Sequence, residues 1–233
     1  MGVSIRAGSA LVGVASMFFL GACDNKFDFA NVIVPVASTL TVVAGSNNQV
    51  GIAGQALPVP ITVHVLDQNG NPIAGAVVSW TIIGASGTVS SPTSTTNASG
   101  NASVIWTLGT LARTDSLTAS LANGVSVLIT AVATAGPFTN LLISSGNPQT
   151  ISTASASASL VVKAVDANGN PVSGVTVGFT TSPAAPLSAP SAMTNVNGLA
   201  SVMLLAGAPV GGVDITAIAG VAAPVVFHVT VNP

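Results

Sequence analysis

Apolar and polar residues alternate along most of this chain with a period of two. The alternation is clearest in ITVHVLD (61–67) and VVFHVTV (225–231), where apolar residues occupy every second position. A period of two is typical of β-strands that bury one face. Gly, Pro and Asn interrupt the apolar segments at short intervals, as expected for turns between strands. In the first half of the chain the pattern predicts about seven strands, near residues 39–44, 59–66, 76–83, 87–90, 102–108, 115–121 and 125–133.

The pattern occurs twice. DQNGNPIAG begins at Asp67, and DANGNPVSG begins at Asp166, 99 residues later. The segments TTNASGNASV and MTNVNGLASV follow in the same order and lie 98 residues apart. A repeat of this length is the size of an independent domain rather than of a solenoid unit. We therefore predict an all-β fold of two tandem immunoglobulin-like β-sandwiches, with domains at 38–135 and 137–232.

The repeated DxNGNP motif falls between two predicted strands, where a turn is required. Asn and Gly tolerate positive φ, Asp hydrogen-bonds backbone N–H groups ahead of it, and Pro ends the preceding strand. The motif also resembles the start of an EF-hand loop, but that loop needs Gly at its sixth position and Glu at its twelfth. Here Gly is fourth and the chain has no Glu, so we expect no metal ion and no cofactor. The predicted structural turn residues are Asp67, Asn69, Gly70, Asp166, Asn168 and Gly169.

The two motifs D-x-N-G-N-P and T-N-x-x-G-x-A-S-V together resemble the bacterial immunoglobulin-like domains, group 1, which are the repeats of the intimin/invasin family of adhesins. Asn97 and Asn195 stand where that family often has Asp. The resemblance implies an immunoglobulin-like fold and a spacer role. Family adhesins also carry an N-terminal β-barrel and a lectin-like tip, which we do not identify in this sequence. The resemblance therefore does not extend to binding of a host receptor.

The N-terminal segment resembles a bacterial lipoprotein signal. A basic start is followed by a short apolar run, and the sequence LGAC then ends at Cys23, the only cysteine in the chain. In the lipobox that LGAC resembles, the Cys thiol receives a diacylglycerol and becomes the N-terminus after cleavage. The resemblance implies a signal peptide at 1–22, lipid attachment at Cys23 and a tether at 23–37. Two or three acyl chains, as in mature lipoproteins, are enough for a stable anchor.

Composition narrows the class of protein further. Charged residues make up 4% of the chain, against roughly 25% in ordinary soluble domains. The net charge of −2 provides no basic surface, so we expect no binding of nucleic acid. Beyond the N-terminus, no apolar run approaches the ~20 residues of a membrane-spanning helix. The membrane contact that we expect is therefore the N-terminal lipid.

Residues that commonly carry catalysis are sparse. His64 and His228 lie in different predicted domains, each at an outward position of its strand. Asp67 and Asp166 are assigned to turns, and no G-x-S-x-G nucleophile motif occurs. Cys23 lies in the signal segment and is assigned to lipid attachment. We therefore expect a protein that is not an enzyme.

The leading hypothesis is a non-enzymatic, lipid-anchored protein of the cell envelope that acts as a structural spacer or adhesion module. We expect it at the outer membrane or cell surface rather than the inner membrane. The alternative is a ligand-binding module that recognises a polysaccharide or an envelope protein through its end loops. Exposure of Trp106 beside a groove would favour this alternative, because Trp80, Phe179 and Phe227 are expected to point inward.

The low content of charged residues also favours association between copies of the chain. Each predicted domain holds only three charged residues, so electrostatic repulsion between copies is weak. We expect lateral self-association, with an edge strand near 39–44 or 138–144 as the contact. The charged residues are Asp67, Arg113 and Asp115 in the first domain and Lys163, Asp166 and Asp214 in the second.

Overall fold

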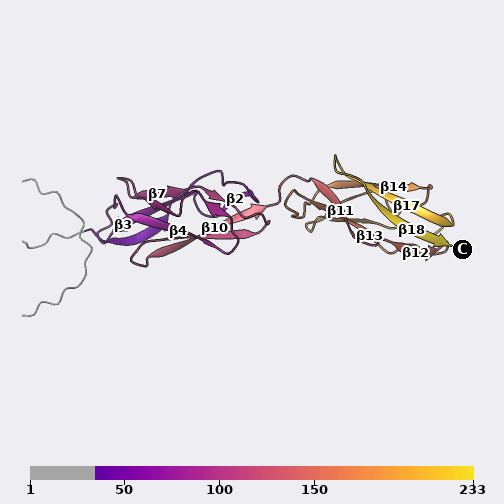
Figure 1. Ribbon diagram of the computed structural model, residues 1–233, viewed down its shortest axis with the longest axis horizontal. Coiled ribbons are helices and arrows are strands. Elements are labelled where there is room, and N and C mark those ends of the chain that lie inside the picture. The colour runs from indigo at the N-terminus through magenta and orange to yellow at the C-terminus, as the bar shows by residue number, and fades with distance from the viewer. Residues whose placement is uncertain (1–34) are drawn as a thin grey trace, which may run out of the picture. The chain divides into compact units, whose positions relative to one another are not determined.

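The computed structural model describes residues 35–233, a unit built of β-strands and the turns that connect them (Figure 1). Two hydrophobic cores lie within this unit, one per domain, so the segment contains what each sandwich needs to fold. Within this segment no helix has the length and hydropathy needed to cross a membrane. The predicted signal peptide, Cys23 and most of the tether lie outside the described residues.

The first domain consists of two facing sheets and a short two-stranded ribbon. Three strands form one sheet in the order β1-β3-β7, five form the other in the order β2-β10-β9-β4-β6, and β5 pairs with β8. All neighbours are antiparallel except β2 and β10. The strands are β1 (Ala37–Val42), β2 (Gln49–Ile52), β3 (Ile61–Asp67), β4 (Val77–Ile83), β5 (Thr88–Val89), β6 (Thr93–Thr95), β7 (Asn101–Val104), β8 (Trp106–Thr107), β9 (Thr114–Ser120) and β10 (Ser126–Thr134).

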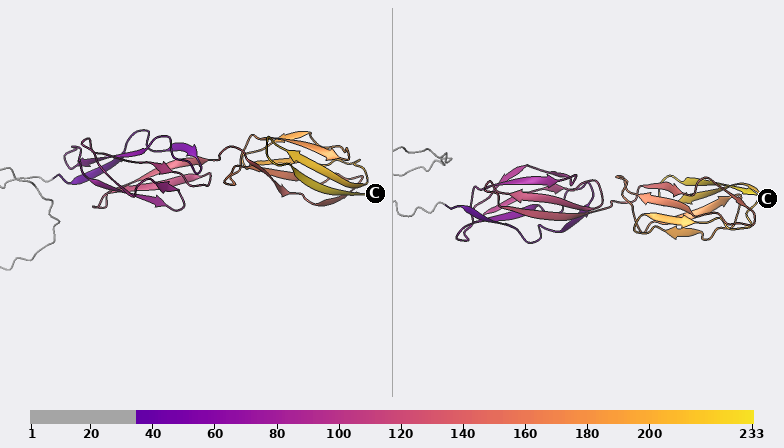
Figure 2. Two further views of the ribbon diagram at one scale, coloured as in Figure 1. Left: turned by 45° about the horizontal axis from the view of Figure 1, so that its top comes forward. Right: turned by 90° about the horizontal axis from the view of Figure 1, so that it is seen from below.

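The second domain repeats the topology of the two facing sheets, and an isolated bridge between Leu187 and Leu204 stands in place of the ribbon. Its sheets run β11-β13-β16 and β12-β18-β17-β14-β15, and β12 pairs with β18 in parallel, as β2 does with β10. Both sandwiches can be followed in the two further views of Figure 2. The strands are β11 (Asn140–Ser145), β12 (Gln149–Ser152), β13 (Leu160–Val165), β14 (Thr176–Ser182), β15 (Ser191–Met193), β16 (Leu199–Val202), β17 (Gly211–Ile218) and β18 (Val225–Asn232). The predicted all-β fold of two immunoglobulin-like sandwiches is confirmed.

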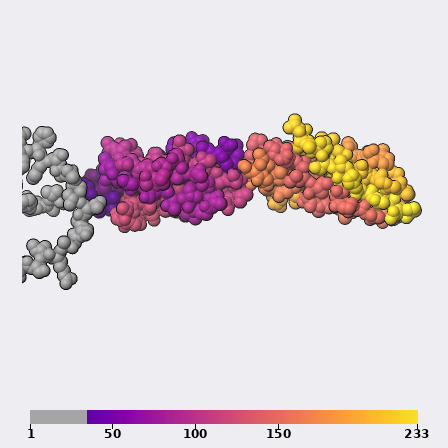
Figure 3. Space-filling model, viewed as in Figure 1, coloured from indigo at the N-terminus to yellow at the C-terminus, as the bar shows by residue number. Residues whose placement is uncertain are grey.

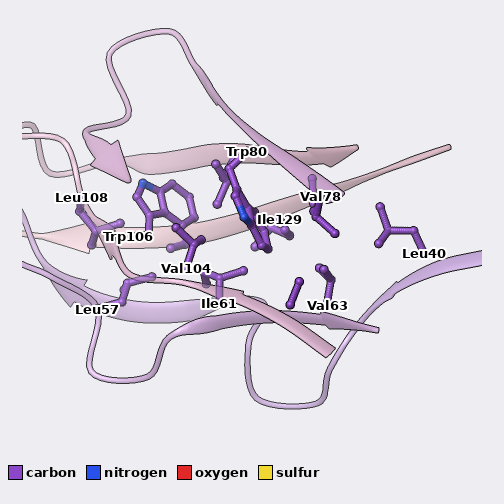
Figure 4. Close-up of a cluster of buried hydrophobic side chains, with 14 of the residues drawn as sticks. Leu40, Leu57, Ile61, Val63, Val78, Trp80, Val104, Trp106, Leu108 and Ile129 are labelled. Atoms are coloured by element: carbon purple, nitrogen blue, oxygen red, sulfur yellow. The ribbon is translucent and has the colours of Figure 1, made fainter. Parts of the chain in front are cut away.

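The cores follow from the alternation seen in the sequence. In β3 the burial pattern alternates strictly, with Ile61, Val63 and Val65 fully buried. Two indole rings fill the first core between the sheets, and both Trp80 and Trp106 point inward (Figure 4). The second core uses Phe179 and Phe227. Burial of aromatic rings of this size dominates the stability of a small sandwich.

The strand prediction missed two strands and joined two others into one. Strands β2 and β6 were not predicted, because they are short segments at sheet edges: QVGI alternates over four residues only, and TST has no apolar residue. The predicted strand at 102–108 is interrupted, since Ile105 separates β7 from β8 and the chain there crosses from one pairing partner to another. Local sequence does not reveal edge pairing, which depends on the neighbouring strand.

Candidate functional site at the recurring turns and the domain joint

The first repeated motif forms the same turn in both domains. The Oδ1 atom of Asp67 accepts hydrogen bonds from the N–H groups of Asn69 (2.8 Å) and Asn71 (2.9 Å). Its Oδ2 atom accepts one from Asn71 Nδ2 at 3.3 Å. Gly70 adopts a φ of 80°, which is strained for residues other than glycine. The carboxylate of Asp67 thus accepts hydrogen bonds from backbone N–H groups that have no strand partner where the chain reverses.

Asp166 makes the corresponding bonds in the second domain. Its Oδ1 atom accepts from the N–H groups of Asn168 and Asn170, both at 2.8 Å, and Gly169 has a φ of 84°. Its Oδ2 atom accepts from Asn170 Nδ2 at 3.0 Å. The N–H group of Gly136 also donates to Asp166 Oδ2 at 2.8 Å, a bond without a counterpart at Asp67 in the part of the chain that the structure describes.

These hydrogen bonds hold the pKa of both carboxyl groups below the ordinary value of 3.8. For Asp67 the largest cause is the hydrogen bond from the backbone of Asn71. Burial raises the pKa of Asp166, but the bonds from Asn170, Gly136 and Asn168 outweigh it. Both side chains are therefore charged at neutral pH and serve as acceptors.

The second repeated motif forms a matching turn with Asn in place of Asp. Asn97 Oδ1 accepts from the N–H groups of Ser99 (2.9 Å) and Asn101 (3.0 Å). In the second domain Asn195 Oδ1 accepts from Asn197 (2.9 Å) and Leu199 (3.1 Å). An amide oxygen supplies the same acceptor as a carboxylate, so the Asn that departs from the family's usual Asp still closes the turn.

The two motifs contact each other, which the sequence did not reveal. The hydroxyl of buried Thr96 donates to Ile73 O (2.6 Å) and accepts from Ala76 N (2.9 Å), in the segment that follows the first motif. Thr194 does the same with Val172 O and Val175 N. A Cβ atom on Gly100 would lie 2.7 Å from Val65 O, so only glycine fits there. The motifs therefore recur together because each supports the other.

At the joint between the domains, the second copy of the first turn has additional partners. Asn170 Nδ2 donates to Thr110 O, and Ala112 N donates to Asn170 Oδ1, both at 2.8 Å. Asn168 Nδ2 lies 3.4 Å from Ala53 O. Thr110, Ala112 and Ala53 all belong to loops of the first domain. In Figure 3 the two domains occupy successive regions of the surface, in the order of the sequence.

Charged residues are more buried than the sequence suggested. Asp67, Asp115 and Asp166 are 6%, 0% and 2% exposed, so three of the six charges counted for the two domains do not lie at the surface. Asp115 accepts a hydrogen bond from Gly109 N at 2.6 Å and pairs with Arg113 Nε at 3.4 Å. Among the described residues, the number of exposed charges that could repel another copy of the chain is therefore smaller than the six counted from the sequence.

The second domain exposes a pair that the sequence did not single out. His228 Nδ1 lies 2.7 Å from Asp214 Oδ1, and both side chains are more than half exposed. The two residues are directly opposite on β18 and β17. Their proximity depends on strand register, which could be identified only by pairing the outward positions of a hairpin. His64 is half-buried on β3 and lies in the other domain.

Trp106 is fully buried, and its Nε1 donates to Ser86 O at 2.8 Å. The exposed indole that would favour ligand binding through the end loops is therefore not present at this position. Within residues 35–233 no group of three or more His, Cys, Asp or Glu side chains is arranged to hold a metal ion.

Fold and turns together define a tandem immunoglobulin-like β-sandwich protein. The family model for the bacterial Ig-like domain (group 1) matches residues 37–135 and 143–230. The chain therefore belongs to this family, and the predicted relationship is confirmed.

Several solved structures are similar to this chain. InvD of Yersinia pseudotuberculosis is 22% identical with a TM-score of 0.51, and the match covers 83% of this chain and 57% of InvD. The Escherichia coli adhesin FdeC is 20% identical with a TM-score of 0.44, over 82% of this chain and 63% of FdeC. The D0-D1 domain of intimin is 22% identical with a TM-score of 0.34, over 82% and 98%. A search of curated proteins found no match to this chain.

Proposed function

We propose that this protein is a lipid-anchored spacer or adhesion module of the cell envelope. The observation that carries the proposal is the combination of a lipobox-like LGAC, ending at the sole cysteine Cys23, with two domains of a family found in adhesins. Acyl chains on Cys23 hold the protein at the outer membrane or cell surface. The two sandwiches then present their surfaces away from the lipid, without catalysis.

Cys23 is the residue that tests the anchor. A Cys23→Ala variant is expected to leave the membrane fraction or to remain unprocessed, whereas an Ala22→Gly variant keeps a small residue beside the cysteine and stays anchored. Fractionation with mass spectrometry of the mature N-terminus measures both. A mature N-terminus that lies elsewhere and carries no lipid would contradict the proposal.

Lateral self-association is the second part of the proposal. Strands β1 and β11 lie at sheet edges, and β11 exposes Leu142 and Ile143. Edge strands with few charges present unpaired backbone groups to other chains. A second copy of this chain on the same membrane is therefore the partner that we propose for these edges. Binding of a polysaccharide or of an envelope protein through end loops has less support, since Trp106 is in the core.

A further inference from the structure

Asn170 is held in place before it reaches the neighbouring domain. It is 4% exposed, its backbone N–H donates to Asp166 Oδ1, and its side-chain amide donates to Asp166 Oδ2. An amide fixed in this way loses little rotamer freedom when it makes further hydrogen bonds. Its remaining donor and acceptor are both used, on Thr110 O and Ala112 N of the first domain.

The loop that receives Asn170 is also fixed. Buried Asp115 accepts from Gly109 N at 2.6 Å, and Gly54 N donates to Gly109 O at 2.8 Å. A Cβ atom on Gly109 would lie 2.5 Å from Ala85 O, so the backbone there packs closely. The carbonyl and N–H groups that meet Asn170 are therefore presented by a braced backbone rather than by a free loop.

The connecting segment is bonded to the same turn. Gly136, between β10 and β11, donates its N–H group to Asp166 Oδ2. One carboxylate thus bonds both the linker and the side chain that reaches the first domain. In the first domain the equivalent residue Asn71 is exposed, and among residues 35–233 its side chain has one hydrogen bond, the one to Asp67.

We infer that Asp166 and Asn170 form an interdomain clamp that fixes the second sandwich relative to the first; within residues 35–233, their copies Asp67 and Asn71 have no such contacts. The inference holds whether or not Cys23 carries lipid, so it stands apart from the proposed anchor. Both direct bonds end on backbone atoms of Thr110 and Ala112, so the clamp is insensitive to the side chains in that loop. In the second domain, the turn that contains Asp166 and Asn170 therefore limits the motion of one sandwich relative to the other.

The 35–233 segment suits a direct test, because it contains both cores and no cysteine. Spin labels at Thr93→Cys and Ser191→Cys occupy exposed, equivalent positions on β6 and β15. Pulsed electron paramagnetic resonance then gives the distribution of distances between the domains. The reference chain is expected to give one narrow distribution.

Asn170→Ala removes both direct bonds and is expected to broaden the distribution of distances. The population of molecules in which the joint is open should increase on the order of tenfold. Asn170→Asp keeps the shape but places a carboxylate beside Asp166 and Thr110 O, so it should broaden the distribution at least as much. Asn71→Ala and Asn71→Asp make the same local changes in the other turn and are expected to leave the width unchanged.

Two outcomes would overturn the clamp. The first is an unchanged width in both Asn170 variants, with both domains shown to be folded by circular dichroism. The second is equal broadening in the Asn71 and Asn170 variants, which would mean that turn damage rather than a lost interdomain bond moves the labels. Broadening restricted to the Asn170 variants supports the clamp.

Discussion

Asn71 and Asn170 occupy the same position of the same turn but differ in their surroundings. Asn71 is exposed and bonds to Asp67, whereas Asn170 is buried and bonds to Asp166 and to two backbone groups of the other domain. The local sequence, NGNP in both copies, is identical. A repeated motif can therefore carry one structural role in every copy and a second role only where a neighbouring domain meets it.

The largest expected effect on stability comes from Trp106, a core residue of the first domain; the second domain has no tryptophan. Trp106→Ala should lower the free energy of unfolding of the first domain by about 3–5 kcal/mol, because a fully buried indole leaves a cavity. Urea unfolding followed by the fluorescence of Trp80 reports this domain alone, since the second domain has no tryptophan. Val50→Ala, at a 60% exposed position, is the control and should change stability by less than about 0.5 kcal/mol. A Trp106 effect of that small size would contradict the core assignment.

The next effect tests whether the turns are equivalent. Gly100→Ala and Gly198→Ala should each destabilise their own domain by about 2–4 kcal/mol, because φ is positive and the new Cβ meets a carbonyl oxygen at 2.7 or 2.6 Å. Gly70→Ala has a similar φ but open space around it, so it should cost only about 1 kcal/mol. Thermal unfolding by circular dichroism measures all three. Unequal costs for Gly100 and Gly198 would break the equivalence of the two copies.

A smaller effect concerns the carboxylates and pH. The pKa of Asp67 and of Asp166 is lower in the folded protein than the ordinary 3.8. Each group therefore stabilises the fold above that value, and the stabilisation is lost as pH falls through the lower, folded pKa. Asp67→Asn and Asp166→Asn should both flatten the loss of stability below about pH 4.

The Asp166→Asn change should also free the linker, because Asp166 accepts from Gly136, whereas the described residues show no such bond to Asp67. Urea unfolding at a series of pH values measures the first effect, and the rate of protease cleavage within TAGPF (134–138) measures the second. Equal cleavage rates in both Asn variants would contradict the distinction between the two copies.

The smallest expected effect is association. Sedimentation of the 35–233 segment should show weak self-association that rises with protein concentration and changes little with salt, since few charges are exposed. A Leu142→Lys variant places a charge on exposed β11 and should reduce association, while Thr41→Lys on exposed β1 shows whether that edge also contributes. A strictly monomeric segment at high concentration would remove the proposal.

Much of the fold could be predicted because it depends on local periodicity and on repetition. Alternation in ITVHVLD places Ile61, Val63 and Val65 inside, and the repeat gives the second domain from the first. Short edge strands such as β2 and β6 could not be predicted, because their pairing with β10 and β4 is decided across the sheet. The turn residues were predicted from their chemistry. The contact at the joint was not, because nothing in NGNP distinguishes Asn71, which bonds to Asp67, from Asn170, which also meets Thr110 O.

The parallel pairing of β2 with β10 has a mechanical consequence. Asn123, just before β10, donates to Ala37 O, so the chain enters the first domain beside the start of β10 and leaves it at the end of that strand. Tension between residues 37 and 134 therefore acts along β10 and loads its hydrogen bonds to β2 and β9 in shear. Bonds loaded in shear must break together, whereas a hairpin peeled from its end loses them one at a time. The strand that leads into the second domain is thus loaded in shear when the chain is pulled.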